Sequence, residues 1–278
     1  MKSDLEKIIL DTIDIPSLPT VAMKALELIN DGGSSINELE KIISQDQSFS
    51  ARLLRIANSP YYGMNRRIDT ISSGVMLIGF NTMKSLVVAA SLKDMHRKFG
   101  LFEQKLWEHS LGVSVASSLL AKVTKMLPPE EALVGGLIHD VGKTILNNSI
   151  PDKYALISQK VYEEGKFFRD VETELLGYNH CDVGGLIARK WKLPKNLEAV
   201  IQYHHSETLP VFEDNAYEAL CQIVNVSDAA CLSMSIGIKG PENVKVPYNM
   251  VGLDEAGYSK FLEMFKANYA EQKAKLTE

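Results

Sequence analysis

The stretch GLIHDVGK, residues 136–143, sets a histidine and an aspartate side by side at the end of an apolar run. Leu133 and Leu137 are four residues apart, which is the spacing of one face of a helix. Adjacent helical residues point about 100° apart, so His139 and Asp140 can serve one metal ion twice or reach two neighbouring ions. Imidazole and carboxylate groups are ligands of divalent transition metals. The stretch therefore predicts a metal-binding pair at the end of an apolar helix.

Helical spacing continues in both directions from this stretch. Apolar residues recur every three or four positions almost throughout the chain, which predicts an all-α fold. The first hundred residues hold about five short helices, and one of them opens with the capping box Ser35-Ile-Asn-Glu38. Residues 71–78 and 83–90 read as two successive helices. The longer helices that we predict cover residues 102–125, 129–139, 152–163, 180–191, 194–204, 216–235 and 254–275.

The change from short to long helices indicates two packed helical lobes. We expect an N-terminal lobe over residues 1–100 and a C-terminal lobe over residues 101–278. The junction near residues 97–100 is short and only weakly loop-like, so the two lobes are not expected to be joined by a flexible linker.

Composition excludes several classes of protein. The chain has 278 residues, of which 45% are hydrophobic and 23% charged, as in ordinary globular proteins. It contains no uncharged apolar window of about 18 residues, so no membrane span is expected. The net charge of −5 and the lack of long basic runs argue against nucleic acid as a partner. Three cysteines without CxxC spacing and an N-terminus without signal-peptide features predict a cytoplasmic protein.

Further histidines and an aspartate stand in similar settings along the chain. They are His109 in LWEHS, His180 in GYNHCDVGG, His204-His205 in QYHHSE and Asp228 in NVSDAA. Each lies on a different predicted helix whose other side is apolar, so a helical bundle would bring the polar side chains together. Together with His139 and Asp140 they form a candidate ligand set.

Simpler interpretations of the same residues remain open. His139-Asp140 also fits a histidine at a helix end beside a capping aspartate. His204-His205 also fits a solvent-facing pair, and Asp228 fits an interior aspartate that backbone amides satisfy. Lys143 also fits a solvated lysine at a helix end.

The order H, HD, H, HH and D resembles the HD superfamily of metal-dependent phosphohydrolases, and GLIHDVGK carries the resemblance most specifically. Residues 15–31 (IPSLPTVAMKALELIND), 43–63 (ISQDQSFSARLLRIANSPYYG) and 68–90 resemble the HDOD subgroup, so the resemblance spans about residues 15–235. HDOD proteins are all-α signalling modules of bacteria, and many lack the metal ligands that this chain retains. The resemblance implies that the C-terminal lobe is an HD-like helical bundle.

The resemblance also implies a role for each candidate residue. A first metal site maps to His109, His139, Asp140 and Asp228, and a second to His180, His204 and His205 with Asp140 bridging. Lys143 matches a lysine that meets a substrate phosphate, so Asp140 and Lys143 are the candidate catalytic residues of an enzyme. We expect two divalent ions, of iron, manganese or zinc.

The sequence differs in two features from those relatives that cleave cyclic dinucleotides. Lys105 stands where some of them carry a third-metal glutamate, so a third ion is not expected. Residues 204–217 read HHSETLPVFEDNAY and lack the Gly-Tyr-Pro loop of those relatives.

The resemblance predicts a signal-transduction or regulatory protein whose partner is a signalling protein or a small phosphorylated ligand. The alternative is a metal-dependent phosphohydrolase that cleaves a phosphoester such as a nucleotide or cyclic nucleotide. An enzyme needs an open coordination position and a regulatory site does not, so the sequence leaves catalysis and the oligomeric state open.

Overall fold

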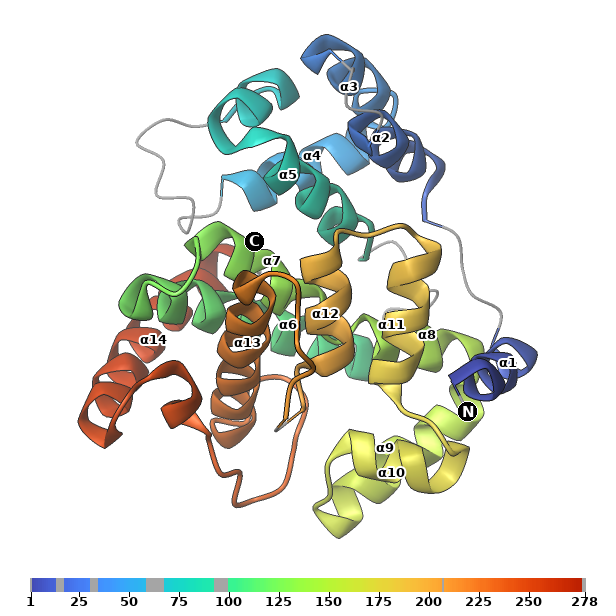
Figure 1. The fold of residues 1–278 in the computed structure, drawn as a ribbon, viewed down its shortest axis with the longest axis vertical. Coiled ribbons are helices and arrows are strands. Elements are labelled where there is room, and N and C mark those ends of the chain that lie inside the picture. Colours follow the sequence, from blue (N-terminus) through green and yellow to red (C-terminus); the bar gives the residue numbers. More distant parts are fainter. Residues whose placement is uncertain are drawn as a thin grey trace. The chain divides into compact units, whose positions relative to one another are not determined.

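The structure is a computed structural model and describes residues 2–13, 18–30, 35–58, 68–92, 100–206 and 208–276. Every regular element in these ranges is a helix, which confirms the predicted all-α fold (Figure 1). The chain divides into two compact units, one of residues Pro16–Arg97 and one of Met1–Ile15 with Lys98–Glu278. Residues 1–15 thus group with the larger unit, whereas the sequence prediction placed them in the N-terminal lobe. All predicted metal ligands belong to the larger unit.

The smaller unit contains four helices among its described residues. They are α2 (Thr20–Asn30), α3 (Ile36–Ile43), α4 (Gln47–Ala57) and α5 (Ile71–Leu92). The capping box is confirmed, because Ser35 Oγ accepts from the Glu38 amide (3.2 Å) and Glu38 Oε2 accepts from the Ser35 amide (3.0 Å). Gly79 breaks α5 with non-helical backbone angles (φ 79°, ψ 166°), in agreement with the two successive helices that the sequence predicts.

The larger unit begins with α1 (Lys2–Thr12) and continues from residue 100 onward. Its other elements are α6 (Leu101–Thr124), α7 (Pro129–Ile138), α8 (Val141–Ser149), α9 (Pro151–Glu164), α10 (Phe168–Leu176), α11 (His180–Lys190), α12 (Lys195–Tyr203), α13 (Asn215–Ser233), the 3-10 helix η3 (Tyr248–Val251) and α14 (Glu255–Leu276). Helix α6 packs on α7, α13 and α14, and α11 packs on α8 and α12. Among the described residues, no helix combines the length and the hydrophobicity of a membrane-spanning segment.

Helices α8 and α10 were not predicted from the sequence. Each is nine residues long, and helices of this length are marginal on their own. Tertiary packing stabilises them instead, since Ile145 and Leu146 of α8 and Phe168 and Val171 of α10 are buried.

Two glycines allow helices that carry predicted ligands to approach closely. A Cβ atom on Gly136 of α7 would lie 2.8 Å from the Cα atom of Ser114 in α6. A Cβ atom on Gly142 of α8 would lie 1.9 Å from the carbonyl oxygen of His180 in α11. Real Cβ atoms do not approach backbone atoms so closely, so only glycine permits either contact. The glycines therefore hold the end of α7 and the start of α8 against the helices that bear His109 and His180.

Substituting Gly142 tests the second contact. Gly142→Ala is expected to lower the free energy of unfolding by about 3 kcal/mol, because the methyl group forces α8 away from the α11 backbone. Gly165→Ala is the control: Gly165 has a positive φ (62°), but a Cβ atom there meets nothing within 4 Å. The control should lose about 1 kcal/mol from backbone strain alone. Urea denaturation followed by circular dichroism measures both values, and equal losses would contradict the packing argument.

Candidate metal centre

The ends and inner faces of six helices bring the seven predicted ligands together. They are His109 of α6, His139 at the end of α7, Asp140 at the start of α8, His180 at the start of α11, His204 and His205 at the end of α12, and Asp228 of α13. All except His205 are at most 3% exposed. The His205 side chain is 18% exposed. A solvent-facing pair is therefore the wrong description of His204-His205, since His204 is fully buried.

Asp140 lies at the centre of this group, and its two carboxylate oxygen atoms point toward different ligands. Its Oδ1 atom lies 3.4 Å from His180 Nε2 and 3.6 Å from His204 Nε2. Its Oδ2 atom lies 3.3 Å from His139 Nε2 and 3.7 Å from His109 Nε2. Each carboxylate oxygen thus faces a different pair of imidazoles.

Asp228 approaches the same imidazoles from α13. Its Oδ1 atom lies 2.9 Å from His109 Nε2 and 3.8 Å from His139 Nε2. Its Oδ2 atom lies 3.4 Å from His205 Nδ1. Asp228 therefore contacts imidazoles from three other helices, and two of these imidazoles also face Asp140.

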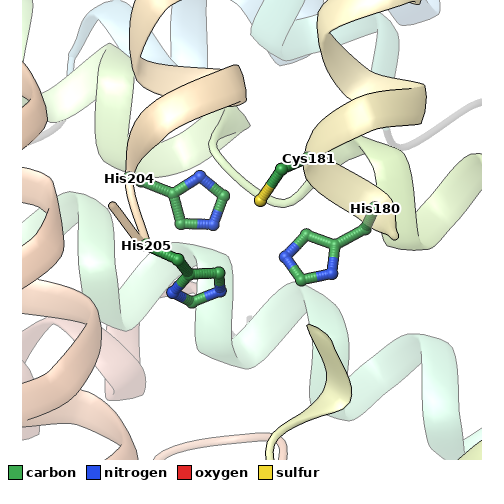
Figure 2. A group of neighbouring side chains, drawn as sticks. All are labelled: His180, Cys181, His204 and His205. Atoms are coloured by element: carbon green, nitrogen blue, oxygen red, sulfur yellow. The ribbon is translucent and has the colours of Figure 1, made fainter. Parts of the chain in front are cut away.

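The side chains form two clusters, each compact enough to hold a metal ion. Within each cluster the potential ligand atoms lie within 4.8 Å of one another. The first cluster, which we call cluster A, consists of His109, His139 and Asp228. The second, cluster B, consists of His180, Cys181, His204 and His205 (Figure 2). A further group of His139, Asp140 and His204 meets the same distance limit and connects the two clusters.

Backbone carbonyl groups orient three of the imidazoles. His109 Nδ1 lies 3.1 Å from the Ile236 oxygen, and His139 Nδ1 lies 2.7 Å from the Gly136 oxygen. His204 Nδ1 lies 3.0 Å from the oxygen of Val200. A carbonyl oxygen only accepts hydrogen bonds, so each Nδ1 atom carries the proton and donates it. In His139 and His204 the Nε2 atom is then the one that faces the Asp140 carboxylate with its electron pair, whereas His109 Nε2 is hydrogen-bonded to Asp228 Oδ1 (2.9 Å).

Several of the inward-facing atoms have no hydrogen-bond partner. They are His139 Nε2, His180 Nε2, His204 Nε2 and Asp140 Oδ1, all of them buried. Buried polar atoms are nearly always paired, because an unpaired one costs about 1–3 kcal/mol. Nitrogen and oxygen atoms that converge in a buried site without hydrogen-bond partners are suited to a cation. The residues therefore fit the divalent metal ions that the sequence predicts.

Glu172 of α10 is part of the centre, and the sequence prediction missed it. It is fully buried, and its Oε2 atom accepts hydrogen bonds from His180 Nδ1 (2.6 Å) and from the His180 amide (2.8 Å). Its Oε1 atom accepts from the Tyr154 hydroxyl group (2.7 Å). The available signal was its position four residues after Phe168, on the buried face of the helix. Glu172 therefore fixes the orientation of the His180 ring, as backbone carbonyl groups fix the rings of His109, His139 and His204.

Lys143 is buried beside the Asp140 carboxylate and is not a solvated helix-end lysine. Its Nζ atom lies 2.7 Å from Asp140 Oδ2 and 5.4 Å from the centre of the Phe168 ring. Burial lowers the pKa of Lys143, but the charges of Asp140, Asp228 and Glu172 outweigh burial and raise it. The side chain is therefore a permanent ammonium group at the edge of the centre.

Both aspartates are ionised in this setting. Burial opposes ionisation of Asp140, but the neighbouring His139 imidazole and the Lys143 ammonium group hold its pKa well below the usual range. Burial likewise opposes ionisation of Asp228, but the hydrogen bond with His109 and the nearby imidazoles lower its pKa. The centre therefore presents two carboxylates to a cation at neutral pH.

The imidazoles of cluster B differ in their protonation. Burial lowers the pKa of His204, and it lowers the pKa of His205 well below the usual range. Both rings are therefore neutral, which is the form that binds metals. Burial also lowers the pKa of His180, but Cys181 and Glu172 outweigh it and raise that pKa to about 9. A metal ion at His180 consequently displaces a proton.

Removing the Glu172 carboxylate tests its structural role. Glu172→Ala is expected to lower the free energy of unfolding of the metal-free protein by about 3 kcal/mol, because it leaves buried donors of His180 and Tyr154 unpaired. Tyr154→Phe is the matched control and should lose less, about 2 kcal/mol, because it leaves one oxygen atom of Glu172 unpaired but keeps both bonds to His180. Urea denaturation gives both values. A loss for Glu172→Ala no larger than that of Tyr154→Phe would show that the carboxylate does not hold His180.

Comparisons with known proteins agree with this architecture. An uncharacterised protein of Treponema pallidum (strain Nichols) is 24% identical over 198 residues, which is 69% of this chain and 38% of that protein. This chain thus spans little more than a third of the length of that relative. The structure of an HDOD domain protein of unknown function from Geobacter sulfurreducens is 25% identical, with a TM-score of 0.71 over 99% of this chain and 94% of that one.

A candidate phosphohydrolase from Shewanella amazonensis shares the fold. It is 24% identical, with a TM-score of 0.67 over 95% of this chain and 94% of that one. The family model of the HDOD domain matches residues 15–207. That match covers more than half of the sequence, and so the chain belongs to the HDOD domain family.

Proposed function

We propose that this chain is a signal-transduction module of the HDOD family that binds two divalent metal ions in its larger unit. The arrangement of Asp140 carries the proposal. Its two oxygen atoms face separate imidazole pairs, His180 with His204 and His139 with His109. A carboxylate in this arrangement is suited to bridge two neighbouring ions.

Each ion has its own set of protein ligands in this proposal. His109, His139, Asp228 and Asp140 would hold the first ion. His180, His204 and His205 would hold the second, with Asp140 shared between the two. Imidazole and carboxylate ligands accept iron, manganese and zinc, so the donors do not select one of these metals at the first position.

A regulatory role is favoured over catalysis because the ligands are enclosed. All the proposed ligands except His205 are at most 3% exposed. Structural metal sites are closed, whereas catalytic sites keep a coordination position open to substrate. The centre would then stabilise or report a state of the helical unit, and its partner would be a signalling protein or a small phosphorylated ligand.

Lys143 favours the alternative of a metal-dependent phosphohydrolase. Its buried ammonium group lies 2.7 Å from Asp140 and would offset the charge of a substrate phosphate. Bound divalent ions would supply a water molecule of lowered pKa and polarise a phosphoryl oxygen. The similarity in fold to a candidate phosphohydrolase is consistent with this alternative. The substrate would be a phosphoester such as a nucleotide or cyclic nucleotide.

The metal content of the purified protein tests the centre. Plasma mass spectrometry on protein prepared without tag or chelator is expected to give about two ions of iron, manganese or zinc per chain. No bound metal, even after anaerobic reconstitution, would overturn the proposal.

Removing the bridging charge tests the role of Asp140. Asp140→Asn keeps the shape of the side chain but removes its charge, so the variant should lose most of the metal at both positions. Asp152→Asn, at an exposed aspartate at the start of α9, is the matched control and should retain the full metal content. Wild-type metal content in Asp140→Asn would refute the bridging assignment. If the metal-loaded wild type hydrolyses a phosphoester and Asp140→Asn does not, the result would favour the enzymatic alternative.

A further inference from the structure

Cys181 lies inside cluster B, although the predicted ligand set contains only nitrogen and oxygen donors. It follows His180 in the first turn of α11, where the Asn179 side chain accepts a hydrogen bond from its amide (2.9 Å). The side chain is buried, with the residue 7% exposed. Its sulfur atom and one nitrogen atom of each imidazole of the cluster all lie within 4.8 Å of one another. Figure 2 shows the sulfur atom directed into the space between the rings of His180 and His204.

The neighbouring imidazoles supply an independent indication of a ligand at this position. The Nε2 atoms of His180 and His204 are fully buried and have no hydrogen-bond partner. Two unpaired nitrogen donors and a thiol in one buried cluster match the donor types of a mixed nitrogen and sulfur metal site.

We propose that Cys181 is a sulfur ligand of the second metal ion, together with His180, His204 and His205. The proposal rests on the metal centre of the proposed function and deepens it. The thiol proton passes to solvent when the sulfur binds the ion, because the thiolate is the form that binds metals.

A sulfur donor makes the two metal positions chemically different. The first position offers only imidazole and carboxylate donors, which suit manganese as well as iron and zinc. Thiolate is a softer donor and favours zinc, iron or cobalt over manganese. The second position is therefore selective for the softer ions, and manganese, where it binds, is expected at the first position only.

The other two cysteines provide matched controls. Cys221 and Cys231 lie on α13 and are buried like Cys181, but neither belongs to a cluster that could hold a metal among the described residues. Burial raises the pKa of Cys221 to about 12, so its thiol stays protonated. Cys221→Ala therefore removes a buried thiol without removing a proposed ligand.

Cobalt(II) loading of the 278-residue chain tests the proposal. Sulfur ligation of cobalt(II) produces an intense near-ultraviolet charge-transfer band, whereas nitrogen and oxygen ligands produce only the weaker visible bands. The wild type is expected to show both kinds of band. Cys181→Ala should lose the charge-transfer band and keep visible bands from the first position, and Cys221→Ala should match the wild type. X-ray absorption on the zinc-loaded wild type should show sulfur at about 2.3 Å from the metal.

The outcomes separate this proposal from the proposed function. Visible bands without a charge-transfer band in the wild type, or a charge-transfer band that persists in Cys181→Ala, would overturn the role of Cys181 and leave the metal centre standing. A wild type that binds no cobalt and no zinc would overturn both. The presence or absence of the charge-transfer band in the wild type tests sulfur ligation even if a cysteine variant fails to fold. Circular dichroism identifies such a variant.

Discussion

The buried carboxylate of Asp140 imposes the constraint that the surrounding helices satisfy. Moving an isolated carboxylate out of water costs several kcal/mol unless positive charge or hydrogen-bond donors replace the lost hydration. The Lys143 ammonium group supplies part of that replacement at 2.7 Å from Oδ2. Imidazoles lie on both sides of the carboxylate, and each oxygen faces its own pair. Asp140 Oδ1 has no hydrogen-bond partner, so the metal ions that we propose would complete the compensation that Lys143 begins.

The position of the ligands at helix ends explains how so many polar groups meet in an apolar bundle. His139 ends α7, Asp140 precedes α8, His180 begins α11, and His204 ends α12. A helix end can place a polar side chain at the centre while the rest of the helix packs through apolar residues. The close approach of α8 to α11 at Gly142 holds two of these ends together. The geometry of the centre is consequently a property of helix packing.

The groups that orient the imidazoles fall into two kinds. The carbonyl groups next to His139 and His204 lie three or four residues earlier on the same helix, so helical geometry supplies them. Ile236 and Glu172 come from distant segments and reach the centre only through the fold. Glu172 is the only charged acceptor among these groups, and it serves His180, the neighbour of Cys181. The two metal positions therefore differ in their outer contacts as well as in the donors that we propose.

The helical fold class, the capping box at Ser35 and the break within residues 71–90 follow from the sequence alone. Each depends on spacing along one helix, where 3.6 residues per turn fix the direction of a side chain. The seven polar residues that meet were predicted from their settings on separate helices and from the resemblance to the HD superfamily. The tertiary structure decided which Asp140 oxygen faces which imidazoles and that Glu172 and Cys181 join the centre. Glu172 lies on a helix too short to be predicted, and Cys181 lacks the spacing of a cysteine metal motif. Distances between helices depend on packing and on glycine contacts such as that of Gly142, and no local pattern contains that information.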